Sequence, residues 1–463
     1  MKYVDRKVED IKIAYIGGGS RGWAWGLMSD LVSYSDISGE VCLYDIDFEA
    51  AQNNEIIGNK FNSAEGAKTV WNYKATKTIG EALTGANFVI ISILPGTFDE
   101  MESDVHTPEK YGIYQSVGDT SGPGGIVRAM RTIPMYEEIA ENIKKYCPDA
   151  WVINYTNPMT LCVKTLYRVF PEIKAFGCCH EVFGTQHILC DMIKETLDVE
   201  RPRRREIKVN PISVNHFTWL TSAKYRDMDL VPMYKDFTEK HKDGFSHQTN
   251  HWMNNSFASE QKVKFDLFNK YGYIAAAGDR HLAEFCEGKW YLASPERVNE
   301  MHFGLTSVAW RKKDLENRLA RSARLVSGEE AVQIKNTDEE GVMQMRALLG
   351  LCELVTNVNL PNRGQIPNLP LGAVVETNAV FRAGSLDPVF AGPIPTEIYP
   401  LVSRVCAEQE LVSEGIAERN IDKIFAAFIN DPLVTCSFDE AKALFKEMCE
   451  NTKEYLKSFD LDF

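Results

Sequence analysis

A glycine-rich turn between a strand and a helix constrains the fold of this chain more than any other sequence feature. Residues 11–16 are an apolar run with strand character, and residues 23–31 follow a helical pattern. The turn between them matches G-x-G-x-x-G, the fingerprint of dinucleotide-binding folds. Such glycines let the backbone approach a pyrophosphate, whose charge favours the amino end of the following helix. The predicted cofactor-binding residues of this turn are Gly17, Gly19, Ser20 and Gly22.

An acidic residue after the next strand specifies the cofactor further. Residues 41–44 form a second apolar run, and Asp45 follows it directly. A carboxylate at this distance from the turn binds the adenosine ribose hydroxyls and disfavours a 2′-phosphate. We therefore expect NAD and not NADP. The turn alone would indicate no more than a tight bend; the strand, the helix and Asp45 together favour a dinucleotide site.

Strands and helices alternate along the first two hundred residues. Further strand-like apolar runs, with helical patterns between them, occur at residues 71–75, 87–93, 150–154 and 173–176. This alternation predicts an α/β fold with a right-handed, mostly parallel, doubly wound Rossmann-like sheet. Residues 97–125 look polar and irregular, and irregular segments of that length are usually functional or disordered. The expected NAD-binding domain spans residues 1–200.

The pattern changes after about residue 200. Residues 207–221 look extended, and long helical stretches are expected at 322–356 and 396–429. We expect residues 201–463 to form a mixed α+β substrate domain that closes over the first domain. A chain of 463 residues is too long for a single core, which agrees with this division.

Charge and hydropathy argue against several classes of partner. The chain has 51 basic and 65 acidic residues and a net charge of −14, which disfavours nucleic acid and anionic membranes. Its longest apolar stretch, residues 88–94, is too short to span a bilayer, and the polar opening residues do not resemble a signal peptide. Eleven cysteines without regular spacing indicate reduced thiols. We therefore expect a cytoplasmic protein that binds a small molecule.

A cysteine and a histidine are candidate metal ligands. Cys179 follows the strand-like run at 173–176, so it should lie where ligands of an open α/β sheet gather. A thiolate is a soft metal ligand, and His216 offers an imidazole as a second donor. We expect these two residues to hold a divalent metal over the substrate. The plainer alternative for Cys179 is a buried core thiol, because free cysteine is among the most buried residues.

The motifs together resemble those of the family 4 glycoside hydrolases, which use NAD and a divalent metal. The resemblance covers nearly the whole chain and implies a C-terminal half like that of lactate and malate dehydrogenases. Besides the glycine turn and Asp45, it rests on residues 118–125, Arg128, Arg131, 156–158, 179–182, 215–216, 278–281 and 359–370.

The chemistry that this resemblance implies is a redox-assisted elimination. NAD takes a hydride from sugar C3, and the resulting ketone acidifies the proton on C2. A base removes that proton, and the enolate expels the leaving group from C1 with help from an acid. Water then adds, and NADH returns the hydride. The metal, usually Mn²⁺, acts as a Lewis acid on the C2 and C3 oxygens.

The resemblance also implies catalytic roles for single residues. Cys179 and His216 are the metal ligands, Asp119 is the leaving-group acid and Asp279 is the C2 base. Plainer roles are a loop cap for Asp119 and a surface ion pair for Asp279.

The implied substrate-binding residues follow the same motifs. They are Asn157 in the Thr-Asn-Pro turn, His180 beside the ligand cysteine, and Arg280 beside the base. An asparagine before proline also forms turns for purely local reasons. His180 could instead support the metal loop, and Arg280 could tune the charge of Asp279 or serve in a surface ion pair.

Two features indicate the sugar. Members of the family that act on phosphosugars place an arginine near the position of Met101, but no Arg or Lys lies between residues 97 and 109 here. The sequence Cys-His-Glu-Val at 179–182 resembles the α-galacturonidase subgroup. We therefore expect an α-galacturonide, with α-glucuronide, α-glucoside and α-galactoside as alternatives. A uronate carboxylate needs a cation, for which Arg280 and Arg382 are both candidates.

Two other classes of function stay open from the sequence. A 2-hydroxy-acid dehydrogenase would share the N-terminal architecture, but it would use His, Asp and Arg without a metal. A redox-sensing regulator would bind NAD without turnover. The family resemblance further implies a homodimer or a homotetramer.

Overall fold

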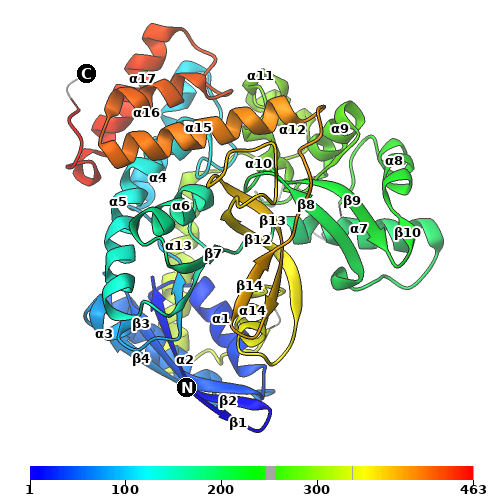
Figure 1. Cartoon of the computed structure of the whole chain (residues 1–463). Helices are drawn as coiled ribbons and strands as arrows, with labels where there is room; N and C mark the ends of the chain where they lie inside the picture. The colour runs from blue at the N-terminus through cyan, green and yellow to red at the C-terminus, as the bar shows by residue number, and fades with distance from the viewer. Residues whose placement is uncertain (247–256, 336, 462–463) are drawn as a thin grey trace.

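The computed structural model describes residues 1–246, 257–335 and 337–461. A twisted sheet with helices on both faces forms the N-terminal part, and the C-terminal helices lie at the opposite end of the molecule (Figure 1). A smaller sheet of β8–β11 projects to one side between these two parts.

Six adjacent strands of the large sheet are parallel, in the order β7-β6-β5-β2-β3-β4, with β4 at the edge. The order reverses direction between β2 and β5, and ligands of open α/β sheets bind at such a switch point, at the carboxyl ends of the strands. The strands are β2 (Lys7–Ile16), β3 (Ile37–Tyr44), β4 (Trp71–Thr76), β5 (Phe88–Ile91), β6 (Trp151–Asn154) and β7 (Lys174–Gly177), and β1 (Lys2–Val4) pairs with β2.

Both faces of the parallel strands are buried, which explains their continuous apolar runs. Along β5, Phe88 and Ile90 enter one core, and Val89 and Ile91 enter the other. The first core is closed by α1 (Trp23–Val32), α2 (Phe48–Phe61) and α14 (Gly341–Leu348). The second is closed by α3 (Ile79–Leu83), α5 (Gly122–Tyr146) and α6 (Met159–Val169).

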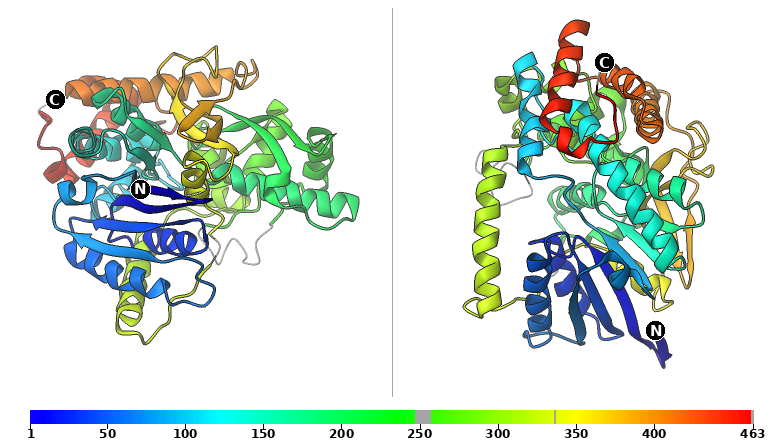
Figure 2. Two further views of the ribbon diagram at one scale, coloured as in Figure 1. Left: turned by 60° about the horizontal axis from the view of Figure 1, so that its bottom comes forward. Right: turned by 90° about the vertical axis from the view of Figure 1, so that its left-hand side faces the viewer.

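Segments from the second half of the chain complete the first half. Three antiparallel strands, β12 (Leu354–Pro361), β13 (Val374–Arg382) and β14 (Ser385–Pro388), extend the large sheet beyond β7. The long helix α13 (Val308–Ser327) packs against α2 and α4 (Phe98–His106). Figure 2 shows α13, in yellow-green, beside the blue N-terminal part. The large sheet therefore contains strands from both sides of the domain boundary predicted at residue 200.

The smaller sheet and the C-terminal helices have cores of their own. The small sheet consists of β8 (Ile207–Ile212), β9 (Trp219–Tyr225), β10 (Met228–Asp229) and β11 (Ile274–Ala275). It packs with α7 (Glu181–Leu197), α8 (Val231–Lys240) and α9 (Lys262–Tyr271). The largest core joins the start of α5 to α10 (Asp279–Glu284), α11 (Gly288–Tyr291), α12 (Pro295–Glu300), α15 (Tyr399–Glu418), α16 (Ile421–Asn430) and α17 (Phe438–Asn451).

The predicted fold class, a parallel Rossmann-like sheet followed by a mixed α+β part, is confirmed. Among the residues that the structure describes, no helix combines the length and the apolar composition that crossing a bilayer requires.

Three local predictions were wrong. Residues 97–125 are not irregular throughout, because Thr97 and Glu100 form a capping box that begins α4. Residues 322–356 are not one helix: α13 ends at Ser327, before Gly328 with a φ of +88°, and β12 begins at Leu354. Residues 396–429 form two helices, since Arg419 adopts a left-handed conformation and Asn420 caps α16.

Candidate active site

The glycine turn lies at the carboxyl end of β2, directly beside the end of β3. Gly17 has a φ of +89°, and a Cβ there would lie 2.0 Å from the Ser92 carbonyl oxygen, so this position requires glycine. The Gly19 amide donates to Asp45 Oδ2 at 2.9 Å. The N-cap residue of α1, Gly22, has no side chain that could cap the first turn, so this turn suits an anion. The residues present therefore fit a dinucleotide, as predicted.

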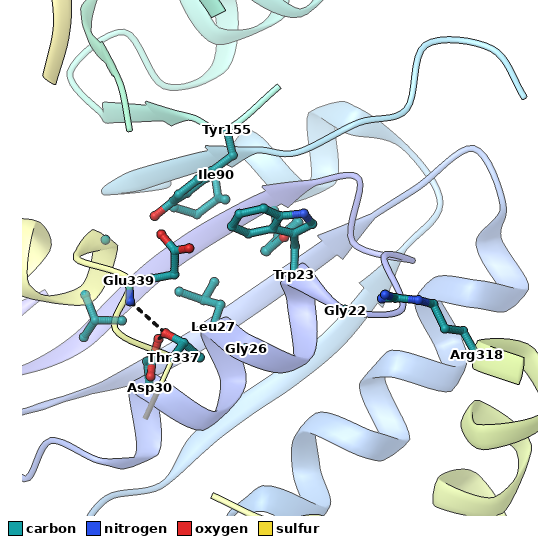
Figure 3. A pocket seen from close by; sticks show the side chains of 13 residues that line it. Gly22, Trp23, Gly26, Leu27, Asp30, Ile90, Tyr155, Arg318, Thr337 and Glu339 are labelled. Atoms are coloured by element: carbon teal, nitrogen blue, oxygen red, sulfur yellow. Dashed lines mark hydrogen bonds between the residues drawn. The ribbon is translucent and has the colours of Figure 1, made fainter. Parts of the chain in front are cut away.

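A cavity of about 290 Å³ adjoins this turn on the α1 side (Figure 3). Its walls come from α1, from Tyr155 after β6, and from the segment that leads into α14. The Trp23 ring packs on Tyr155, with ring centroids 5.5 Å apart, and on His180 at 6.0 Å. His180 also pairs through Nδ1 with Glu339 Oε1 at 2.9 Å and is half exposed. His180, which follows β7, therefore lies beside the start of α1, next to the dinucleotide turn.

A cluster of potential metal donors lies at the same edge of the large sheet. Asp119 precedes α5, His216 lies between β8 and β9, and His281 belongs to α10. Their donor atoms all lie within 4.8 Å of one another, and the two imidazole rings have centroids 3.9 Å apart. Two imidazoles and a carboxylate are a donor set that suits a divalent cation. The residues present therefore fit a metal.

The neighbours of His216 prepare one of its ring nitrogens for a cation. The Thr120 hydroxyl donates to Asp119 Oδ1, so His216 Nδ1, 3.1 Å away, must donate to that hydroxyl oxygen. This leaves a lone pair on Nε2. Burial and the neighbouring His281 lower the pKa of His216 to about 3, so the ring is neutral near pH 7. A neutral imidazole is the form that binds metals.

Asp119 is strongly influenced by its surroundings. Burial alone would raise the pKa of its carboxyl, but His281, His216 and Arg128 outweigh this and hold it well below its usual range. Asn157 Nδ2 donates to Asp119 Oδ2 at 3.2 Å, so two predicted site residues do meet. Asn157 Oδ1 is buried and has no hydrogen-bond partner among the described residues. An ionised Asp119 favours a ligand role over an acid role; the predicted acid role stays a prediction.

Cys179 lies at the end of β7, as predicted, but outside the cluster of three donors. Its thiol is buried. Burial raises the pKa of this thiol well above its ordinary value, and the Glu376 and Glu181 carboxylates raise it further. The role of Cys179 as a metal ligand therefore stays a prediction.

Glu181 connects the end of β7 to α10. Its Oε2 accepts from the Gly278 amide at 2.6 Å, and its Oε1 lies 3.8 Å from His281 Nε2. Burial raises the pKa of Glu181, but the nearby histidines, His281 above all, lower it to about 2. Glu181 thus carries a charge and holds His281 next to His216.

Asp279, the predicted base, is buried at the start of α10. Its Oδ1 accepts from the Lys264 amide at 3.0 Å, and its Oδ2 has no hydrogen-bond partner among the described residues. Burial raises the pKa of Asp279 to about 6 despite the nearby Lys264 ammonium. That value suits a general base near neutral pH, and the assignment stays a prediction.

The two arginines predicted for a substrate carboxylate differ in position. Arg280 is buried and donates to the Ser116 and Gly304 carbonyl oxygens and to Thr306. Arg382 is mostly exposed at the end of β13, where its nearest carboxylate is Glu353 at 3.9 Å. Arg382 therefore lies apart from the cluster around Asp119.

Sequence reasoning missed several residues that the fold brings to this site. His281 stands in the quoted 278–281 motif, next to two residues that received roles, so its position was a usable signal. Lys264 and Arg311 lie in ordinary helical sequence, and nothing local distinguishes them. Lys264 is buried and donates from Nζ to Thr185 Oγ1 at 2.8 Å. Met101, where a phosphosugar enzyme would place its arginine, is buried against Val105 and Val308.

The chain matches sequence profiles of known proteins along most of its length. Residues 12–195 match the Family 4 glycosyl hydrolase profile, and residues 213–434 match the profile of that family's C-terminal domain. An alpha-galacturonidase of Thermoanaerobacterium saccharolyticum is 61% identical over 463 residues, which cover 100% of both chains. An alpha-galacturonidase of Thermoanaerobacter italicus is 55% identical over 460 residues, 99% of this chain and 100% of the relative.

Solved structures agree with these matches. The crystal structure of lplD from Bacillus subtilis has a TM-score of 0.91 and 50% identity, and the match covers 95% of this chain and 100% of that one. A 6-phospho-alpha-glucosidase from gut microorganisms, crystallised with NAD and Mn²⁺, shares the fold with a TM-score of 0.79 at 18% identity; the match covers 96% of this chain and 99% of that one. With two profile matches and a full-length relative of 61% identity, the chain belongs to the family 4 glycosyl hydrolases.

Proposed function

We propose that this enzyme hydrolyses α-galacturonides with the help of NAD and a divalent cation. The observation that carries the substrate assignment is identity of 61% and 55% along the whole chain with two alpha-galacturonidases. The Cys-His-Glu-Val sequence at 179–182 and the buried Met101 support it, since neither favours a phosphosugar.

The cofactors have defined places in this proposal. When bound, NAD supplies a hydride acceptor and donor for sugar C3, and the cation supplies a Lewis acid for the C2 and C3 oxygens. The glycine turn and Asp45 would hold the dinucleotide. His216 would bind the cation. Its neighbours Asp119 and His281, and the predicted ligand Cys179, are the candidates for the other ligands. Mn²⁺ is the proposed metal, because a carboxylate donor suits it and the 6-phospho-alpha-glucosidase of the same fold was crystallised with NAD and Mn²⁺.

The remaining roles follow from the contacts in the site. Asp279 is the proposed base for the C2 proton, through its unpartnered Oδ2. Asn157 offers its unpartnered Oδ1 to a sugar hydroxyl, and its amide orients Asp119. His180, between Trp23 and Glu339, is the proposed contact between the sugar and the dinucleotide side.

Turnover of three para-nitrophenyl glycosides tests the substrate assignment. The α-galacturonide, the α-glucuronide and the neutral α-galactoside are compared at equal concentration, with NAD, Mn²⁺ and a reductant. We expect the galacturonide to be hydrolysed fastest and to require both cofactors. A neutral galactoside hydrolysed at least as fast would show that the substrate assignment is wrong, although the family would stand.

A further inference from the structure

Arg280 and Arg311 approach the site from two different helices, and neither pairs with a carboxylate among the described residues. Within the described chain, Arg280 in α10 donates to carbonyl oxygens and a hydroxyl only. Arg311 lies in the first turn of α13, and its Nε is buried without a hydrogen-bond partner in the described chain. Both guanidinium carbons lie 5.1 Å from the centre of the Phe257 ring. The two cations therefore share one aromatic surface.

The charges around this pair are unbalanced. Glu284, Glu181 and Asp119 attract Arg280, and Asp119 and Asp314 attract Arg311, but none of them forms an ion pair with either guanidinium among the described residues. Asp314 is itself paired with Arg318, and Asp119 also faces Arg128. By contrast, Arg131, one helical turn after Arg128 in α5, is fully paired with Asp104. Residues 247–256, which precede Phe257 in the sequence, include no Asp or Glu that could supply the missing charge. Partly desolvated cations without a counter-charge are costly, so this region is built for an anion.

The position of Arg311 is fixed by the packing of α13. Ser307 Oγ caps this helix by accepting from the Trp310 amide at 3.2 Å, and Val308 is buried against Met101 and Val105 of α4. The following Lys312 pairs with Asp99, also in α4. These contacts fix the first turn of α13, so the Arg311 guanidinium approaches the site from a well-anchored backbone.

We propose that Arg311, with Arg280 beside it, binds the C6 carboxylate of the substrate sugar. The inference rests on the proposed function and identifies the residues that give it uronic acid specificity. A guanidinium fork binds a carboxylate through two parallel hydrogen bonds, and Arg311 still has its donors free. Arg280 directly precedes His281 in α10, and His281 clusters with Asp119 and His216, so in this proposal the sugar has its carboxylate towards α13 and its C2 and C3 hydroxyls towards His216.

Arg311→Gln is the sharpest test, because Arg311 makes no side-chain hydrogen bond within the described residues and its loss breaks none. Arg324→Gln is the matched control: it removes the same charge from the same helix, at a residue paired with Glu330. We expect Arg311→Gln to lower kcat/KM for the α-galacturonide by about 10- to 100-fold, mainly through KM, as a lost charge-assisted hydrogen bond would. Hydrolysis of the neutral α-galactoside should change by less than about twofold. Arg311→Lys should recover part of the loss, since it restores the charge without the fork.

Binding of free galacturonate and of galactose, measured by calorimetry with NAD and Mn²⁺ present, separates this inference from the proposed function. If the wild type binds galacturonate more tightly than galactose and Arg311→Gln removes that preference, the carboxylate subsite is supported, whichever glycoside is hydrolysed. A preference retained by Arg311→Gln would overturn the subsite and leave the substrate assignment intact. The subsite would also be overturned if the wild type bound both sugars equally, or if Arg311→Gln lost the same affinity for both. Faster turnover of a galactoside 6-phosphate than of the galacturonide would overturn it as well.

Discussion

At the scale of single residues, the site depends on groups whose protons are fixed by their neighbours. Thr120 has one hydroxyl hydrogen and gives it to Asp119, so His216 has to donate from Nδ1. Asn157 then orients the other oxygen of Asp119. The result is a neutral imidazole and an ionised carboxylate facing the same small space, prepared for a cation before one binds.

Exchanging single donors should identify the metal ligands. We expect His216→Ala to abolish measurable Mn²⁺ binding. His216 belongs both to the ligand pair predicted with Cys179 and to the cluster with Asp119 and His281. Cys179→Ser should weaken Mn²⁺ binding if the thiolate is a ligand. His281→Gln should weaken Mn²⁺ binding if the cluster of Asp119, His216 and His281 is the metal site. Titration of free Mn²⁺ by electron paramagnetic resonance measures all three. Equal Mn²⁺ affinity in His216→Ala and the wild type would show that the metal binds elsewhere.

The dinucleotide site gives a second prediction at this scale. Asp45→Ala should weaken NAD binding by about 1–3 kcal/mol, the usual worth of a hydrogen bond to a charged group. The same change frees the Gly19 amide, which adds loop disorder to the loss. Fluorescence titration with NAD measures the effect. The control is Asp36→Ala, which removes a carboxylate that directly precedes β3 and pairs with Arg346. NAD affinity equal to the wild type would mean that Asp45 does not hold the ribose.

The residues predicted from local sequence were those that the backbone itself positions. Gly17 and Asp45 follow predicted strands, and the parallel sheet brings strand ends together, so their proximity could be expected. Arg311 could not be found in this way. It reaches the site only because α13 returns from the second half of the chain to pack on α4. The contact between His216 and His281 likewise depends on tertiary packing.

At the scale of elements, the amino end of α9 is stabilised from outside. Its own N-cap residue, Gln261, makes no capping hydrogen bond, and Asp279 at the start of α10 accepts from the Lys264 amide instead. One carboxylate thus caps a helix with Oδ1, while its buried Oδ2 has no hydrogen-bond partner among the described residues. Sequence periodicity predicted helices between the parallel strands but neither α9 nor α10, and it could not show that one helix caps another.

Two substitutions at Asp279 separate these tasks. Asp279→Asn keeps an acceptor for the Lys264 amide, so its thermal midpoint should stay near that of the wild type, while removal of the C2 proton should be almost lost. Asp279→Ala should also lose about 0.5–2 kcal/mol of stability, the usual cost of removing a helix cap. Thermal melts and exchange of the C2 proton measure the two effects. Normal C2 exchange in Asp279→Asn would mean that another group is the base.

At the scale of the whole molecule, a buried acid pair joins the C-terminal helices to the site. Asp431 Oδ2 accepts from the Gly122 amide at the start of α5, and Glu408 of α15 lies beside it. Burial and the Asp431 carboxylate raise the pKa of Glu408 well above its ordinary value, so the pair shares a proton. The large sheet also takes strands from both halves of the chain, which ties the halves together. The dimer or tetramer expected from the sequence stays a prediction.

This acid pair should make stability depend on pH. Below pH 4.5, the ordinary pKa of Glu408, folded and unfolded chains both hold the proton. As pH rises above that value, only the unfolded chain releases it, so stability falls with a slope of up to about 1.4 kcal/mol per pH unit. Glu408→Gln should remove this slope. The thermal midpoint of the variant should therefore rise relative to that of the wild type as the pH increases from 5 to 8. Parallel curves would contradict the assignment.

Hydrolysis of an α-galacturonide in D₂O tests the central claim most directly. In the proposed cycle the C2 proton leaves to a base that exchanges with solvent, and the hydride taken from C3 is returned. Nuclear magnetic resonance of the released galacturonate should therefore show deuterium at C2 and protium at C3, with no net loss of NAD and no product when NAD or Mn²⁺ is left out. A product with protium alone at C2, formed at the same rate without NAD, would contradict it.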